Sequence, residues 1–240
     1  MKGLTALITG ASGGIGKAIC RRLAKEGVNL ILFGGTNAEK LRDFALALKK
    51  DFKDIRADFY PCDLTDDAAV KSALKNVTAN GVDILINNAG LAFSAPIEET
   101  DMEVFDKIMS LNFRAPVLIT KECLPLLKKS ARASIVNIAS VVAHNGYPLQ
   151  SAYTASKHAL LVFSKSIAAE LYEKGIRVHV ISPGGVYTDM IRVARPDLTG
   201  EGMIMPEDVA EAVCFLLKNR TNAVIDEISL HRVGKQPFLG

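Results

Sequence analysis

Cysteine, long apolar runs and excess charge are all scarce in this 240-residue chain. The four cysteines lie far apart and form no Cys-x-x-Cys pair of the metal-binding type, so we expect reduced thiols and no structural metal. No apolar run reaches the ~20 residues that a membrane-spanning helix needs, and no apolar leader precedes the first strand-like segment. The net charge of +3 is too small to indicate nucleic-acid or membrane binding. We therefore expect a cytoplasmic protein that binds neither nucleic acid nor membrane.

The chain does contain short apolar runs that alternate with segments of helical periodicity. The apolar runs predict strands at Thr5–Thr9, Leu30–Phe33, Asp58–Tyr60, Ile84–Ile86, Ser134–Ile138, Arg177–Ile181 and Ala223–Leu230. The periodic segments predict helices near Gly14–Glu26, Ala38–Lys50, Asp67–Ala79, Met102–Lys128, Ala152–Lys174 and Pro206–Lys218. Apolar strands separated by helices are typical of a parallel, doubly wound sheet with helices on both faces. We expect this α/β fold to form a single domain over residues 1–240.

The main irregular stretch, 188–205, is rich in Gly, Pro, Arg and Met. Ligands of doubly wound sheets bind at the carboxyl ends of the strands, so we interpret this stretch as a substrate lid. An ordinary surface connection is the alternative.

A glycine-rich turn, Thr9–Gly16, follows the first predicted strand and opens the first predicted helix. Its glycines at 10, 14 and 16 let the backbone turn tightly and let a pyrophosphate approach. The helix N-terminus supplies free N–H groups and a positive dipole end. Such a turn can be a plain strand–helix connection, but its place in an alternating chain favours dinucleotide binding.

Tyr153 and Lys157 are four residues apart in a predicted helix and therefore project from one face. A positive neighbour lowers the pKa of a tyrosine, which makes the phenol a proton donor or acceptor for carbonyl chemistry. Alone, the pair also fits a helix with one aromatic residue and one solvated cation. Ser140 follows the strand Ser134–Ile138, where its hydroxyl would lie at the carboxyl edge of the sheet.

These motifs, taken in order, resemble the short-chain dehydrogenase/reductase family in its compact single-domain branch. The resemblance covers nearly the whole chain and also includes Cys62-Asp63-Leu64, Asn87-Asn88-Ala89-Gly90, Asn112 and Pro183-Gly184. It implies a Rossmann-type fold and NAD(P)(H)-dependent interconversion of a carbonyl and a secondary alcohol, with Tyr153 as general acid/base. It also implies that Ser140 binds the substrate oxygen, that Lys157 binds the nicotinamide ribose, and that Asn112 holds a water in a proton relay. Asn112 could also satisfy buried backbone groups.

The resemblance further implies a set of cofactor contacts. They are Gly10, Ser12, Gly14, Ile15, Gly16, Asp63, Leu64, Asn88, Ala89, Gly90, Tyr153, Lys157, Pro183, Gly184, Val186 and Thr188. Asp63 has a helix N-cap alternative, a role for which Thr65 and Asp66 compete.

The choice of cofactor depends on the residues after the second strand, Gly34-Gly35-Thr36-Asn37. They include no carboxylate to bind a ribose 2′-OH, whereas Thr36 and Asn37 can donate hydrogen bonds to a 2′-phosphate. The arginine often seen here in NADP-dependent relatives is missing, and Gly13 stands where many have a basic residue. We favour NADP(H) over NAD(H).

Lys157 alone is not expected to lower the pKa of the proton donor Tyr153 far enough. Bringing a tyrosine pKa from about 10 to about 7 requires roughly 4 kcal/mol. An exposed ion pair supplies only ~1 kcal/mol, so we expect a desolvated site in which the charge of the oxidised nicotinamide assists.

The substrate class stays open between alternatives. The segment Ala223–Arg232 lacks the glycine-rich ending of many 3-oxoacyl-[acyl-carrier-protein] reductases, which favours a small carbonyl or 3-hydroxy acid. A carrier-bound substrate would need a basic patch, for which Arg192 and Arg195 are local candidates. A non-catalytic dinucleotide sensor would not need Tyr153. The apolar long helices predict a homo-oligomer, a dimer or homotetramer.

Overall fold

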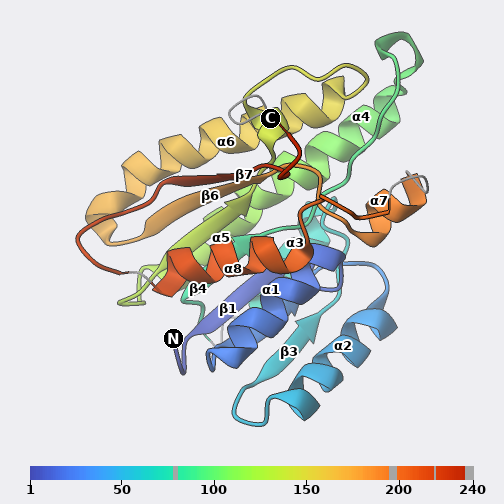
Figure 1. Ribbon diagram of the computed structural model, residues 1–240. Coiled ribbons are helices and arrows are strands. Elements are labelled where there is room, and N and C mark those ends of the chain that lie inside the picture. Colours follow the sequence, from blue (N-terminus) through green and yellow to red (C-terminus); the bar gives the residue numbers. More distant parts are fainter. Residues whose placement is uncertain (78–80, 195–198, 219, 236–240) are drawn as a thin grey trace.

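The computed structural model describes residues 1–77, 81–194, 199–218 and 220–235 (Figure 1). Its strands are β1 (Thr5–Thr9), β2 (Asn29–Phe33), β3 (Ala57–Tyr60), β4 (Ile84–Asn87), β5 (Ser134–Ile138), β6 (Arg177–Pro183) and β7 (Glu227–Leu230). They form one parallel sheet in the order β3-β2-β1-β4-β5-β6-β7, which confirms the predicted doubly wound fold. The order reverses between β1 and β4, so ligand-binding loops diverge there.

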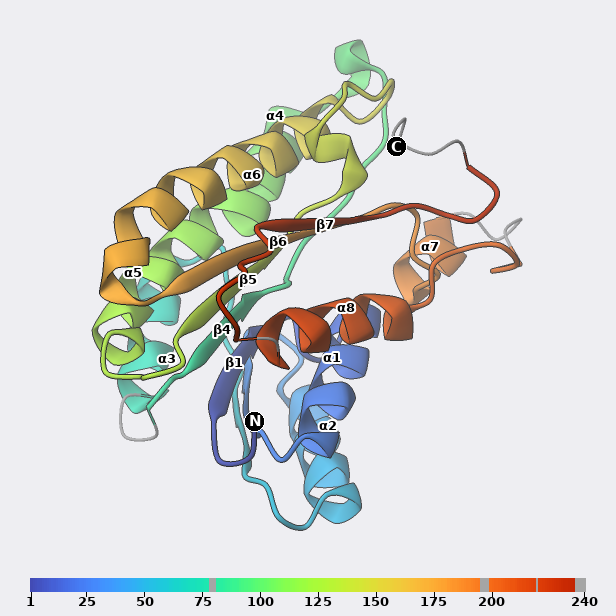
Figure 2. The same ribbon diagram turned by 60° about the vertical axis from the view of Figure 1, so that its left-hand side comes forward.

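Helices cover both faces of the sheet (Figure 2). They are α1 (Gly14–Lys25), α2 (Ala38–Asp51), α3 (Asp67–Val77), α4 (Met102–Met109), α5 (Ala115–Leu127), α6 (Ser151–Leu171), α7 (Asp189–Ala194) and α8 (Pro206–Lys218). One apolar core joins α1, α2 and α8 to the sheet, and a second joins α3, α5 and α6 to the opposite face. In the described residues, no helix combines the length and apolarity needed to cross a membrane.

The largest differences from the sequence prediction concern two elements. The predicted helix Met102–Lys128 is divided by a π-helical turn at Ser110–Arg114. The last strand begins at Glu227 instead of Ala223, and side chains of β6 bond carbonyl groups of the segment before it. His179 bonds the carbonyl of Ile225 through Nδ1 at 2.7 Å, and Arg177 donates to the carbonyl of Thr221 at 2.7 Å.

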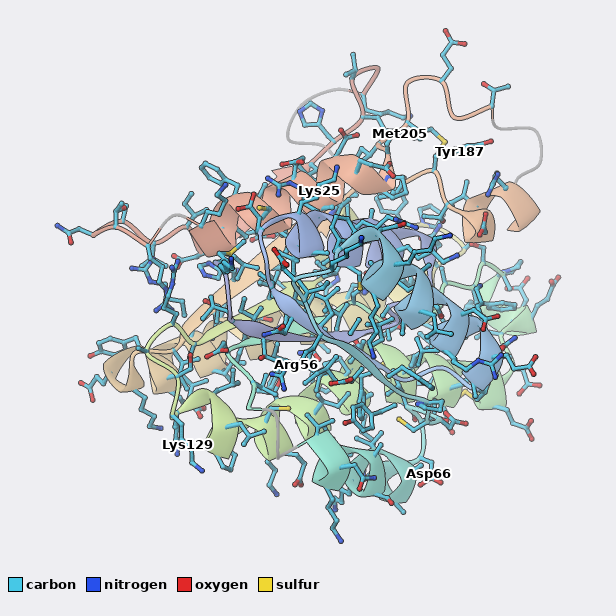
Figure 3. The ribbon with its side chains drawn as sticks, turned by 90° about the horizontal axis from the view of Figure 1, so that it is seen from below. Lys25, Arg56, Asp66, Lys129, Tyr187 and Met205 are labelled. Carbon is cyan, nitrogen blue, oxygen red and sulfur yellow. The ribbon has the colours of Figure 1, made fainter. Side chains whose placement is uncertain are left out.

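The predicted lid contains the short helix α7 and is tied together at its base. Val186 forms a parallel bridge with Ile204, and the amide of Tyr187 donates to the Ile204 carbonyl at 2.8 Å. Tyr187 and Met205 accordingly lie on the same side of the molecule (Figure 3). Residues 195–198, including the basic candidate Arg195, lie outside the described residues.

Candidate active site

The glycine turn after β1 is closed so tightly that its backbone fills the available space. A Cβ at Gly16 would lie 2.2 Å from the Gly10 carbonyl oxygen, and Gly10 itself has a φ of +62°. The amide of Gly13 donates to the Gly10 carbonyl at 3.0 Å. Among the described residues no side chain caps α1, and its first turn holds no acidic residue. The positive helix end is therefore free to meet an anion, and the predicted contacts Ser12 and Ile15 flank it.

A threonine–asparagine clamp ties this turn to the end of β4. Thr9 Oγ1 accepts hydrogen bonds from the amides of Asn88 at 2.9 Å and Ala89 at 3.0 Å. In return, Asn88 Nδ2 donates to the carbonyls of Thr9 at 2.9 Å and Gly10 at 3.2 Å. A Cβ at Gly10 would lie 2.9 Å from Ala89 Cα. The clamp fixes two loops at the point where the strand order reverses.

The loop after β6 reaches across to the same turn. Gly184 donates to the Leu230 carbonyl at 2.7 Å, and Val186 is buried. A Cβ at Gly14 would lie 2.9 Å from Thr188 Cγ2. Pro183, Gly184, Val186 and Thr188 therefore form one path from the end of β6 to the start of α1.

At the predicted adenine-binding end, the hydrogen bonds show which residue caps helix α3. Asp63 is exposed, and its Oδ1 accepts from the amide of Thr65 at 2.8 Å and from Thr65 Oγ1 at 2.7 Å, which lowers the pKa of Asp63. Asp66 accepts from the amides of Ala68 and Ala69 and so provides the cap of α3. The N-cap alternative for Asp63 is therefore wrong.

The neighbouring loop after β2 approaches the same end. Leu64 is buried, and its Cδ1 would lie 2.7 Å from a Cβ at Gly34. Asn37 Oδ1 caps α2 by accepting from the Lys40 amide at 2.9 Å, which leaves its Nδ2 as the available donor. Thr36 is exposed beside it.

Asn112 lies fully buried in the π-helical turn between α4 and α5. Its Oδ1 accepts from the Leu91 amide at 2.8 Å, and its Nδ2 donates to the Leu91 carbonyl at 2.9 Å and to Ser156 Oγ at 3.0 Å. The side chain therefore satisfies buried backbone groups, as one of the two predicted roles requires. Such turns are frequent at functional sites.

Lys157 brings an ammonium group into this buried cluster. Its Nζ donates to the Ile138 carbonyl at 2.8 Å, and a Cβ at Gly90 would lie 3.6 Å from Nζ and 3.3 Å from Asn112 Oδ1. Gly90 thus lies against both side chains. Burial lowers the pKa of Lys157 from its ordinary value to about 8.

Tyr153 and Ser140 face each other at the carboxyl edge of β5. Burial raises the pKa of Tyr153, and a hydrogen bond with Ser140 opposes that shift. Ser140 is buried and accepts from the Val142 amide at 3.4 Å, at the start of the 3₁₀ turn Val141–Ala143. Lys157 Nζ lies 5.8 Å from the centre of the Tyr153 ring. The predicted lowering of the Tyr153 pKa by Lys157 is therefore wrong for the chain alone, because desolvation dominates.

Sequence reasoning missed two contributors to this edge. Ser156 is fully buried and links Asn112 to the Tyr153 carbonyl, to which its hydroxyl donates at 2.7 Å. Its position in Tyr-x-x-Ser-Lys was the available signal. His144, at the end of the turn that follows Ser140, has Nε2 2.7 Å from Glu227 Oε1. Ser182 donates to that same oxygen at 2.6 Å, so one carboxylate joins β6, β7 and the turn after Ser140.

The chain is similar to known proteins in sequence and in fold. The sequence model described as short chain dehydrogenase matches residues 4–199. The chain is 34% identical to 3-oxoacyl-[acyl-carrier-protein] reductase of Rickettsia bellii, covering 96% of this chain and 95% of the relative. It is 34% identical to D-beta-hydroxybutyrate dehydrogenase of Rhizobium meliloti, covering 87% and 81%. The solved alcohol dehydrogenase of Thermococcus sibiricus, complexed with 5-hydroxy-NADP, aligns with a TM-score of 0.89 at 27% identity, covering 98% of each chain.

Proposed function

Since this chain belongs to the short-chain dehydrogenase/reductase family and is an NAD(P)-dependent oxidoreductase acting on CH–OH groups, we propose that Tyr153 is its general acid/base. The observation that carries the proposal is the buried edge at which Tyr153, Ser140 and Lys157 converge with Asn112 behind them. We further propose NADP(H) as the preferred cofactor and a small carbonyl or 3-hydroxy acid as the substrate.

The dinucleotide fits the residues that would hold it. The uncapped start of α1 offers amide groups to a pyrophosphate, and the close contact at Gly16 leaves the turn no room for a side chain. Thr36 and the free amide of Asn37 would donate to a 2′-phosphate, where an acid would repel it. Bound there, the cofactor would supply the hydride.

The protein groups divide the remaining work. Ser140 holds the substrate oxygen, and Tyr153 gives its proton to that oxygen as the carbonyl carbon is reduced. Lys157 holds a positive charge beneath the phenol and stabilises the phenolate that remains. Asn112 fixes the Leu91 peptide and Ser156, and so positions the helix that carries Tyr153 and Lys157.

The test uses NADPH oxidation across a panel of carbonyl compounds, together with fluorescence titrations of NADPH and NADH. We expect turnover of at least one compound and tighter binding of NADPH. Binding of NADPH without any turnover would favour the dinucleotide-sensor alternative, and tighter binding of NADH would contradict the cofactor preference.

Replacing Tyr153 by Phe tests the acid/base role directly. Because general acid–base catalysis contributes about 10²–10⁴-fold, we expect Tyr153→Phe to lower kcat by about 10³-fold. The affinity for NADPH should stay within about twofold, as measured by the same titration. Retained turnover would show that another group donates the proton.

The second substrate candidate is a 3-oxoacyl group on an acyl carrier protein, in line with the name of the Rickettsia relative. Arg192 lies over the Tyr187 ring at 5.7 Å and pairs with Asp189, so in this structure its charge is already engaged. Comparing a carrier-bound 3-oxoacyl substrate with the free acid decides between the two.

Two further proposals concern the whole molecule. The segment 188–205 acts as the lid, because its base is bridged and Thr188 reaches the cofactor turn.

The chain forms a homo-oligomer, because a surface hollow of about 570 Å³ between α4, α5 and α6 exposes apolar side chains. The rings of Phe113 and Phe163 pack there edge to face, with their centroids 6.1 Å apart. Light scattering tests the assembly, and a monomer would contradict it.

A further inference from the structure

The chain leaving β7 places an arginine on the loop that leaves β6. Figure 2 shows the dark red segment after β7 running outward beside the orange segment that leads to α7, and the Gly184–Leu230 hydrogen bond joins them. A Cβ at Gly185 would lie 3.7 Å from Arg232 Nε and 3.4 Å from Met203 Cε. The arginine side chain therefore lies across Gly185, one residue before Val186 on the path to the cofactor turn.

Within the described residues, no acidic group pairs with Arg232. Two acids of the segments that leave β6 and form β7 have other partners: Asp189 pairs with Arg192, and Glu227 binds His144 and Ser182. In the described part of the chain, the hydrogen bonds of Arg232 involve its backbone carbonyl. Arg232 is partly buried, and no acidic side chain of the described residues balances its charge.

The position of Arg232 relates it to the proposed reacting groups. Ser140 follows β5, Gly184 follows β6 and His231 follows β7, so all three lie at one edge of the sheet. Neighbouring strands are about 4.8 Å apart, which places the ends of β5 and β7 about 10 Å apart. The arginine extends back over the β6 loop and shortens that span. A short molecule could reach Ser140 with one end and Arg232 with the other.

We propose that Arg232 binds a carboxylate of the substrate, which makes the substrate a short oxo acid and the product a hydroxy acid. A guanidinium offers a planar fork of donors that matches a carboxylate with two parallel hydrogen bonds. In the reaction the carbonyl carbon accepts the hydride, its oxygen accepts the Tyr153 proton, and the carboxylate is unchanged. This inference rests on the proposed function, whose catalytic groups it uses.

A purely structural role for Arg232 makes a different prediction. If the side chain only packs on Gly185 and Met203 to support the lid, its loss should affect charged and uncharged substrates alike. If it binds a carboxylate, the loss should depend on the substrate charge.

The experiment compares pyruvate, acetoacetate and levulinate with their methyl esters, using the full-length chain and saturating NADPH. We expect the wild-type protein to prefer at least one acid over its ester. Arg232→Gln should lower kcat/KM for that acid by about 10- to 100-fold, through KM, and change the ester by less than about threefold. Arg232→Lys should restore part of the loss, because one donor replaces a fork.

Lys235→Gln is the matched control, since it removes one positive charge from the same segment without touching Gly185. It should leave the acid-to-ester ratio unchanged. An unchanged ratio in Arg232→Gln, or equal losses for acid and ester, would overturn the carboxylate assignment while leaving the reductase proposal intact. If the wild-type protein reduces none of these acids and esters but turns over another carbonyl compound, the carboxylate assignment fails and the reductase proposal stands. If it binds NADPH and turns over no carbonyl compound, both fail.

Discussion

The glycine turn at Gly10–Gly16 and the polar cluster around Asn112 and Lys157 fix their geometry by opposite means. The turn can close only because its glycines have no Cβ, since a Cβ at Gly16 would lie 2.2 Å from a backbone oxygen. The cluster keeps its geometry through side-chain hydrogen bonds. The Asn112 side chain, for example, bonds both Leu91 and Ser156. Adding a Cβ should therefore destabilise the turn, and removing a side chain should destabilise the cluster.

The largest effect is expected at the turn. Gly16→Ala places its Cβ against Gly10, and because the obstacle is backbone it cannot rotate away. We expect a loss of about 3 kcal/mol or more in the free energy of unfolding, measured with urea, together with loss of NADPH binding. Gly146→Ala is the control, since a Cβ there meets nothing within 4 Å. Equal stability of the two variants would break the comparison.

The cluster carries an electrostatic cost that depends on pH. Folded Lys157 loses its proton near pH 8, whereas the unfolded chain keeps it until about 10.5. Between these values the unfolded state binds more protons, so the free energy of unfolding rises with pH. We expect the wild-type protein to gain about 3 kcal/mol over this range relative to Lys157→Met. Parallel pH profiles of the two proteins in urea unfolding would show that the ammonium is not buried as described.

Removing a side chain from the polar cluster should lower the free energy of unfolding by less than adding a Cβ to the glycine turn. Asn112→Ala leaves the Leu91 peptide and Ser156 without their partner, and we expect a loss of about 2 kcal/mol in thermal or urea unfolding. Asn76→Ala, which removes a single exposed bond to Ser72, should cost less than about 0.5 kcal/mol. A similar loss in both variants would mean that water replaces the buried contacts.

The smallest effect sharpens the comparison inside the turn itself. A Cβ at Gly14 meets Thr188, a side chain that can move, instead of backbone. We expect Gly14→Ala to cost about 1 kcal/mol and to become neutral or stabilising in a Thr188→Ala background, because alanine favours the helix. A double-mutant cycle of unfolding free energies measures this coupling, and additive losses would place the obstacle elsewhere.

Most of the architecture could be predicted from the sequence, because strand alternation and motif order depend on local patterns. The π-helical turn could not, since it depends on Asn112 finding the Leu91 peptide across the fold. In the chain alone the pKa of Tyr153 is raised instead of lowered, because the spacing from Lys157 does not show how strongly burial acts on the phenol. The late start of β7 and the position of Arg232 depend on contacts between β6 and β7 that sequence spacing does not reveal.

The way Asn112 holds residue 91 has a consequence for protein engineering. Both of its hydrogen bonds to that residue go to the peptide group, and none goes to the Leu91 side chain. The conformation at position 91 is thus constrained while its identity is not. Libraries can therefore vary this partly exposed side chain without rebuilding the buried polar cluster behind it.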